Sequence, residues 1–232
     1  MHKLTHFRLC AFSRSIRLVL GELRIEAELV EERPWEIRPE FLALNPAGGL
    51  PVLELDGGPI LYGAYAISEY IGEEITRHPV DGLSVPLFPG NREERAEVRR
   101  LVDWFHRKLQ DEVSTHLLEE KLLKRFRSGQ GQPPDAGVMR AVATNLNYTL
   151  GFVDYLMRER HWLAGRELSF ADLAAAAHFS SADYFGEINW SGHEAAKLWY
   201  ARMKSRPAMR AILSDRMPGL AAPPAHYDDP DF

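Results

Sequence analysis

Apolar residues in the first 77 positions fall into short runs that alternate with segments of helical spacing. The pattern predicts strands and helices in the order β-α-β-α-β-β-α, at residues 4–9, 13–23, 26–30, 41–42, 52–55, 60–61 and 64–75. Asp56-Gly57-Gly58 separates the last two strands, as expected for a β-hairpin. This alternation favours helices packed on a mixed sheet.

The remainder of the chain has helical periodicity. Helices are predicted at residues 91–127, 138–160, 169–185, 193–205 and 208–214. Residues 78–90 carry three prolines and two glycines, which is typical of a linker. We therefore predict a first domain at residues 1–77, a linker at 78–90, a helical domain at 91–214 and a tail at 215–232.

The composition limits the class of partner. The 232 residues include 28 Lys and Arg against 33 Asp and Glu, a net charge of −5 that argues against a nucleic-acid-binding protein. Cys10 is the only cysteine, so an intrachain disulfide cannot form, which fits a reducing cytoplasm. No stretch approaches the roughly 20 apolar residues that span a bilayer. We expect a cytoplasmic protein without membrane insertion, cofactor or metal ion.

Several short motifs occur in an order that narrows the fold. They read NPAGGLPVL at 45–53, AISEYI at 66–71, LSFAD at 168–172, WY at 199–200 and RPA at 206–208. Together they resemble cytosolic glutathione transferases over about residues 3–213. The resemblance implies an α/β thioredoxin-like N-terminal domain followed by an all-α helical bundle, and a homodimer.

Two of these motifs have a structural interpretation. Pro51 resembles the family's cis-proline, which exposes the backbone of the preceding residue, here Leu50, to the cysteinyl part of glutathione. Ser169 and Asp172 have the spacing of a capping box at the start of an apolar helix. Both features maintain a fold and say little about activity.

The junction of the first strand and first helix is where this family carries the residue that activates glutathione. Cys10 and Ser13 lie there and are the candidates for a residual catalytic role. The alternative is that Ser13 is the N-cap of the first helix and that Cys10 is a small buried residue. We favour this alternative because one cysteine is a weak motif.

The glutathione site itself departs from the family pattern. The resemblance implies an acidic residue and a serine before the third helix, which hold the γ-glutamyl ammonium and carboxylate. Gly63 and Ala64 occupy these two positions, and neither offers a carboxylate or a hydroxyl. Lost hydrogen bonds to charged groups cost about 1.5–3 kcal/mol each, so we expect the site at Leu50, Pro51, Gly63 and Ala64 to be degenerate.

The tail combines proline, aromatic and acidic residues at a terminus. With the change at Gly63 and Ala64, it resembles glutathione-transferase-like bacterial division factors that bind the tubulin homologue FtsZ. The resemblance implies a non-catalytic homodimer at the division site that binds FtsZ polymer and curves or bundles it. The candidate contacts, which we expect to be exposed, are Trp35, Tyr227, Asp228, Asp229 and Phe232.

Other interpretations remain open from the sequence. The tail could instead pack back over the bundle, and Trp35 could cover the edge of its domain. The chain could be a glutathione- or thiol-dependent transferase that uses Cys10 or Ser13. It could also bind a ligand in an apolar pocket between the domains.

Overall fold

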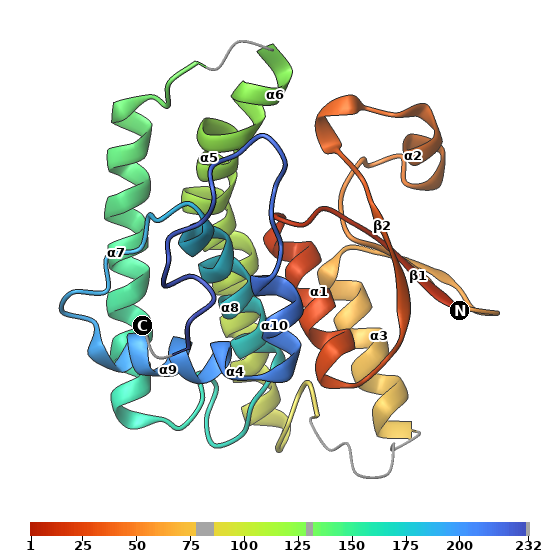
Figure 1. Ribbon diagram of the computed structural model, residues 1–232. Coiled ribbons are helices and arrows are strands. Elements are labelled where there is room, and N and C mark those ends of the chain that lie inside the picture. Colours follow the sequence, from red (N-terminus) through yellow and green to blue (C-terminus); the bar gives the residue numbers. More distant parts are fainter. Residues whose placement is uncertain (78–85, 129–131, 231–232) are drawn as a thin grey trace.

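The computed structural model, which describes residues 1–77, 86–128 and 132–230, places a small sheet domain beside a larger helical domain (Figure 1). The architecture predicted from the sequence, an α/β N-terminal domain followed by an all-α domain, is confirmed. The sheet has four strands: β1 (His2–His6), β2 (Ala27–Glu31), β3 (Val52–Glu54) and β4 (Ile60–Tyr62). Their order is β2-β1-β3-β4, with β1 parallel to β2 and antiparallel to β3.

The first strand begins and ends earlier than the predicted 4–9. A turn closes it, because the Cys10 N–H donates to the Phe7 carbonyl (3.0 Å) and the Phe7 N–H donates to the Ser13 hydroxyl (3.2 Å). The helix after this turn begins at Ala11, so the expectation that Ser13 is its N-cap is wrong. Ser13 instead uses its hydroxyl to hold the end of the strand.

Four helices complete the N-terminal domain. They are α1 (Ala11–Glu22), the 3-10 helix η1 (Pro34–Glu36), α2 (Pro39–Leu44) and α3 (Ala64–Arg77). Leu4 and Leu53, paired across β1 and β3, have no exposed surface and belong to the core of the domain. Of the predicted linker, residues 78–85 lie outside the described part of the chain.

The helical domain begins with one long, nearly continuous helix. Its segments are α4 (Arg92–Asp103), the π-helical η2 (Trp104–Ser114), α5 (Thr115–Leu118), the π-helical η3 (Glu119–Leu123) and α6 (Lys124–Ser128). The other helices are α7 (Ala136–Glu159), α8 (Phe170–Tyr184), α9 (Glu194–Lys204) and α10 (Pro207–Leu213). In the described residues, no helix is long and apolar enough to cross a membrane.

Every residue of α8 is buried, as its apolar sequence predicts. The predicted capping box starts this helix: the Asp172 carboxylate accepts from the Ser169 N–H at 3.1 Å. Asp172 also accepts from the Leu163 N–H and the Trp199 indole, both at 3.0 Å. One carboxylate therefore joins the start of α8 to the preceding loop and to α9.

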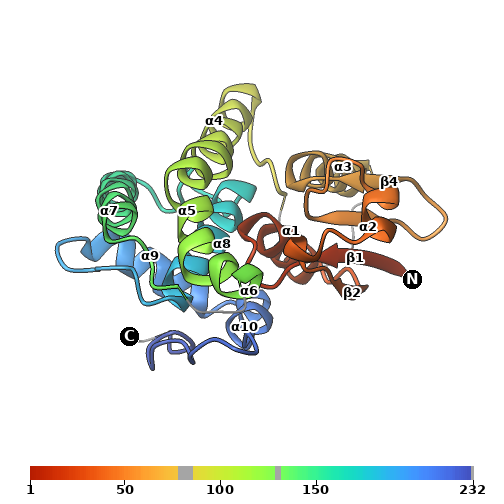
Figure 2. The same ribbon diagram turned by 90° about the horizontal axis from the view of Figure 1, so that it is seen from above.

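The two domains meet along α1, which lies between α8 and β1 (Figure 2). The Ser181 hydroxyl on α8 donates to the Leu9 carbonyl at 3.0 Å. At the far end of α1, Arg206 donates two 2.6 Å hydrogen bonds to Glu22. Polar contacts thus fix both ends of the interface around a buried apolar centre.

Candidate functional site

A cavity of about 430 Å³ opens between the domains, at the position of the family's glutathione site. The residues that line it come from α1, the loop before β3, the end of β4, the start of α3 and the long helix: Phe12, Leu50, Tyr62, Gly63, Ala64, Tyr65, Ala66, Asp103, His106 and Arg107. The predicted site residues Leu50, Gly63 and Ala64 are therefore brought together, in a mainly apolar setting.

The backbone of this site keeps the geometry expected from the motif. The Leu50–Pro51 peptide bond is cis. The Gly63 N–H donates to the Pro51 carbonyl at 2.9 Å, and the Gly63 carbonyl accepts from the Ile67 N–H at 3.1 Å. Gly63 therefore occupies the position that begins α3, with a left-handed φ of 78° and no side chain to cap the helix.

Two positions of the cavity lack the polar side chains that the family resemblance implies for glutathione. Gly63 and Ala64 give no acceptor for the γ-glutamyl ammonium. Among the described residues that line the cavity, Asp103 supplies the carboxylate, but Arg107 binds it through contacts of 2.9 and 2.6 Å. An incoming ammonium would have to displace a charge-assisted pair that is already formed.

Cys10 and Ser13 flank Phe12, which lines the cavity, but neither is among its lining residues. Burial raises the pKa of the Cys10 thiol above 9.0, and this effect outweighs the hydrogen bonds from Ser13 and Phe12. A protonated thiol is a weak nucleophile. Ser13 is fully buried, and its hydroxyl accepts from the Phe7 N–H.

Two buried histidines beside the cavity form a directional hydrogen-bond chain. The Ser15 hydroxyl donates to the Phe12 carbonyl (2.8 Å), so it accepts from His106 Nε2 (3.3 Å). His106 Nδ1 then accepts from His178 Nε2 (3.1 Å), and His178 Nδ1 accepts from the Ser114 hydroxyl (2.7 Å). This order satisfies all four side chains when both imidazoles are neutral.

Burial keeps the two rings neutral. It lowers the pKa of His106 to about 3 and the pKa of His178 well below 6.5, with the neighbouring His106 adding to the effect on His178. Each ring nitrogen is already engaged in the chain. The histidines therefore join α1, η2 and α8, and neither is available as a base for a substrate in the cavity.

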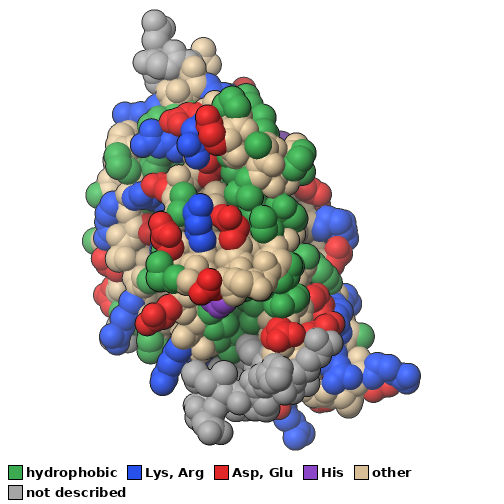
Figure 3. Space-filling view, turned by 90° about the vertical axis from the view of Figure 1, so that its right-hand side faces the viewer, with side chains coloured by type: hydrophobic (Ala, Val, Ile, Leu, Met, Phe, Trp, Pro, Cys, Tyr) green, Lys and Arg blue, Asp and Glu red, His purple; other side chains and the backbone are tan. Residues whose placement is uncertain are grey.

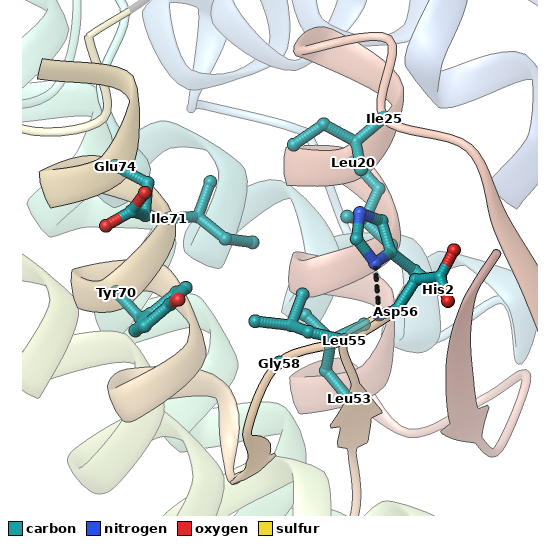
Figure 4. A pocket seen from close by; sticks show the side chains of 10 residues that line it. All are labelled: His2, Leu20, Ile25, Leu53, Leu55, Asp56, Gly58, Tyr70, Ile71 and Glu74. Carbon is teal, nitrogen blue, oxygen red and sulfur yellow. Dashed lines mark hydrogen bonds between the residues drawn. The ribbon is translucent and has the colours of Figure 1, made fainter. Parts of the chain in front are cut away.

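A second cavity, of about 330 Å³, lies within the N-terminal domain (Figure 4). Tyr70, Ile71 and Glu74 of α3 face Leu20 and Ile25 across it (Figure 4). On its rim His2 Nδ1 accepts from the Asp56 N–H at 2.9 Å. Most of the lining is apolar, and this cavity is separate from the one between the domains.

Trp35 lies at the domain interface, away from the residues that line the cavity between the domains. Its ring is half-buried, stacks on Phe126 of α6 with centroids 5.1 Å apart, and meets the edge of Phe7 at 5.4 Å. A Cβ on Gly219 of the tail would lie 3.3 Å from the Phe126 ring. The structure thus brings Trp35, the end of the long helix and the tail to one place, while Trp35 also covers the edge of its domain.

The tail packs against the bundle instead of extending from it, as its dark blue ribbon shows (Figure 1). Tyr227 has no exposed surface, so the expectation that it is an exposed contact residue is wrong. Its aromatic ring meets the edge of Tyr184 at 5.5 Å. The Lys204 ammonium donates to the His226 carbonyl (2.7 Å) and the Asp229 carbonyl (3.3 Å), which holds the backbone on either side.

The acidic side chains of the tail do reach the surface. Asp228 and Asp229 are exposed, and Asp228 pairs with Arg216 at 3.0 Å. The Arg216 carbonyl accepts from Arg8 at 2.6 Å, and Arg8 in turn pairs with Glu31 of β2. Hydrogen bonds and ion pairs therefore link Asp228 of the tail to Glu31 of the sheet domain. Phe232 lies outside the described residues.

A buried arginine that the sequence did not single out anchors this region. Arg14 has no exposed surface and donates to the Arg8 carbonyl (2.6 Å), the Ser180 hydroxyl (2.9 Å) and the Tyr227 hydroxyl (3.0 Å). Its guanidinium also lies 3.4 Å from Asp215. Arginine is usually exposed, so a position directly after Ser13 gave no signal that it would join both domains to the tail.

Comparison with known proteins gives close relatives over the whole chain. A model of the glutathione S-transferase N-terminal domain matches residues 4–77. FtsZ-localized protein A of Caulobacter vibrioides is 46% identical across 99% of the chain and 97% of that protein. The structure of FzlA from C. crescentus is 45% identical, with a TM-score of 0.91 and coverage of 100% of the chain and 99% of that protein.

A crystal structure of a glutathione S-transferase from Rhodospirillum rubrum F11 is 42% identical, with a TM-score of 0.91 and coverage of 100% of both chains. The similarity therefore includes the helical domain and the tail, beyond the N-terminal family domain.

Proposed function

The chain belongs to the glutathione S-transferase family, and we propose that it is a non-catalytic member whose homodimer binds FtsZ filaments and promotes their curvature or bundling during bacterial cell division. The observation that carries this proposal is the 46% identity to FtsZ-localized protein A along nearly the full length of both proteins. We place its action in the cytoplasm at the division site.

The cavity between the domains supports a role without glutathione. Gly63 and Ala64 remove the groups that would bind the tripeptide, and Arg107 already binds the nearby Asp103 carboxylate. The raised pKa of Cys10 leaves the thiol protonated at neutral pH. The thioredoxin-like domain then serves as a rigid scaffold, since a fold can persist while its site is lost.

We place the FtsZ-binding surface where Trp35 and the acidic tail meet. Trp35 is held between Phe7 and Phe126, so an aromatic surface is presented with little loss of side-chain freedom on binding. Asp228 and Asp229 add exposed carboxylates on the same tail, whose Gly219 lies near Phe126. Such charges steer association and make it sensitive to salt.

A homodimer would present this surface twice, which suits the bridging or bending of a polymer.

We propose that the face of α3 with Tyr65 and Glu69 packs against the first half of the partner's long helix. Tyr65 is 45% exposed in the isolated chain, and Arg99 of α4 binds Glu69 through contacts of 2.7 and 2.9 Å. Light scattering should give about twice the 26.4 kDa chain mass, and a monomer would contradict the bridging mechanism.

The competing function is a glutathione- or thiol-dependent transferase that uses Cys10 or Ser13. Two measurements separate the candidates: pelleting of the protein with FtsZ polymer, and turnover in conjugation and thiol-transfer assays. We expect pelleting without turnover. Turnover that Cys10→Ala or Ser13→Ala abolishes, in a protein that does not pellet with FtsZ, would replace our proposal with the enzymatic one.

A further inference from the structure

Ile37 has an unusual backbone conformation. It follows η1 with φ 49° and ψ 50°, in the left-handed region. A branched Cβ clashes there with the backbone, so glycine and asparagine are the residues that normally adopt it. Ile37 therefore carries a local energetic cost in the folded state.

Contacts on both sides hold Ile37 in this conformation. On one side Trp35 is fixed by its stack on Phe126 and by the edge of Phe7. On the other side Arg38 donates to the Glu32 carboxylate, which is 1% exposed, at distances of 2.5 and 3.2 Å. Trp35, two residues before Ile37, and Arg38, directly after it, are thus both anchored by their side chains, which restrains the backbone between them.

Packing does not explain the isoleucine. Its side chain is 68% exposed, so burial of that side chain within this chain offsets little of the free energy that the strained backbone costs. Asparagine or glycine at this position would remove the strain and lose almost no internal contact. A strained residue that the fold does not require is a candidate for function.

The charges around Ile37 are already paired with each other. Arg33 pairs with Glu36 at 3.0 Å, and Arg38 pairs with Glu32. The N-terminal face of the molecule likewise shows hydrophobic side chains between charges of both signs (Figure 3). The loop therefore presents an apolar tip with its own charges balanced, and burial of apolar surface is the main gain that it can offer a partner.

We propose that Ile37 is an apolar anchor of the FtsZ-binding surface, inserted into an apolar recess on the filament next to Trp35. This inference rests on the proposed function. Because the tip is apolar, its contribution to binding should change little with salt, in contrast to the contribution of Asp228 and Asp229.

The test compares Ile37→Asn with wild type in pelleting with FtsZ polymer and in thermal unfolding. We expect Ile37→Asn to unfold at the same or a higher temperature, because asparagine tolerates the left-handed conformation, and to bind FtsZ polymer roughly 10- to 100-fold more weakly. The ratio of the two affinities should be similar at about 50 and about 300 mM salt.

Leu198→Asn is the matched control, because Leu198 is 67% exposed on the regular helix α9. It should leave FtsZ binding unchanged. Wild-type binding by Ile37→Asn, or a marked fall in its unfolding temperature, would overturn the inference. If wild type itself does not pellet with FtsZ polymer, the proposed function fails, and the two failures are thus distinguishable.

Discussion

The Tyr227 hydroxyl and the Arg14 guanidinium, 213 positions apart in the sequence, lie 3.0 Å apart in the core. Tyr227 is fully buried, and Arg14 also binds the Arg8 carbonyl and Ser180. One side chain of the tail is thereby tied to α1 and α8 together. The tail is consequently part of the folded unit, and the backbone that carries its two exposed carboxylates is anchored.

Tyr227→Ala should lower the free energy of unfolding by about 3–5 kcal/mol, as for other buried aromatic side chains cut to alanine. Tyr227→Phe keeps the ring and removes the hydrogen bond from Arg14, so it should cost about 1–3 kcal/mol. Urea unfolding measures both values. Changes below about 0.5 kcal/mol for both variants would mean that the tail is not anchored as the structure indicates.

Asp228→Lys should weaken FtsZ binding while leaving the fold intact. Its pair with Arg216 is exposed, and such pairs contribute about 0–1 kcal/mol to stability. Pelleting at low and high salt should show weaker binding and a shallower salt dependence than wild type. Glu159→Lys, at the exposed C-terminal end of α7, is the charge-matched control. Equal loss of binding in both variants would indicate a net-charge effect and contradict a specific contact at Asp228.

Wild type should show no saturable glutathione binding in the micromolar range by calorimetry. The double variant Gly63→Glu with Ala64→Ser should bind glutathione weakly, because it returns a carboxylate and a hydroxyl to the start of α3. A Cβ at Gly63 meets no atom within 4 Å, although the left-handed φ of 78° will cost about 1–2 kcal/mol. Micromolar binding by wild type would contradict the loss of the site.

Stability should fall as the pH decreases below about 6.5. The folded-state pKa values of His6 and His106 are lowered to about 4 and about 3, mainly by burial. Below pH 6.5 the unfolded chain therefore binds protons at these histidines that the folded protein does not bind, which favours unfolding. Their stabilising effect is complete above pH 6.5 and is lost on acidification, by up to about 1.4 kcal/mol per pH unit for each histidine. Burial raises the pKa of Asp172, which works in the opposite direction and reduces the slope.

Urea unfolding between pH 6.5 and 5 reports mainly on the histidines and on carboxylates of raised pKa such as Asp172, because carboxylates of lowered pKa, such as Asp135 and Asp154, lose most of their stabilising effect at lower pH. His178→Gln should give a shallower slope than wild type, whereas His161→Gln, at an exposed position, should not. A wild-type free energy of unfolding that does not change over this range would show that the buried rings do not control acid stability.

The features that sequence patterns predicted are those that local chemistry decides. The spacing of apolar residues and the turn residues predicted the hairpin around Asp56. The spacing of Ser169 and Asp172 predicted the capping box. The start of α1 was misplaced by two residues, because Ser13 has the side chain of an N-cap but its hydroxyl bonds backward to Phe7.

The candidate site was predicted less well, because its contacts join distant parts of the chain. Gly63 and Ala64 could be recognised by their place in a motif. The Pro-rich, acidic composition around Tyr227 is typical of an exposed terminus, whereas its burial depends on contacts with Arg14 and Tyr184 in distant helices. The stack of Trp35 on Phe126 likewise depends on how the two domains pack.

The most direct test of the central claim is sedimentation of the wild-type protein with FtsZ in GTP, with FtsZ in GDP, and alone, each with and without millimolar glutathione. Electron microscopy of the same samples records filament shape. We predict that the protein pellets with FtsZ only when filaments form, that glutathione has no effect, and that the filaments are curved or bundled. A protein that stays in the supernatant beside abundant FtsZ filaments would contradict the account.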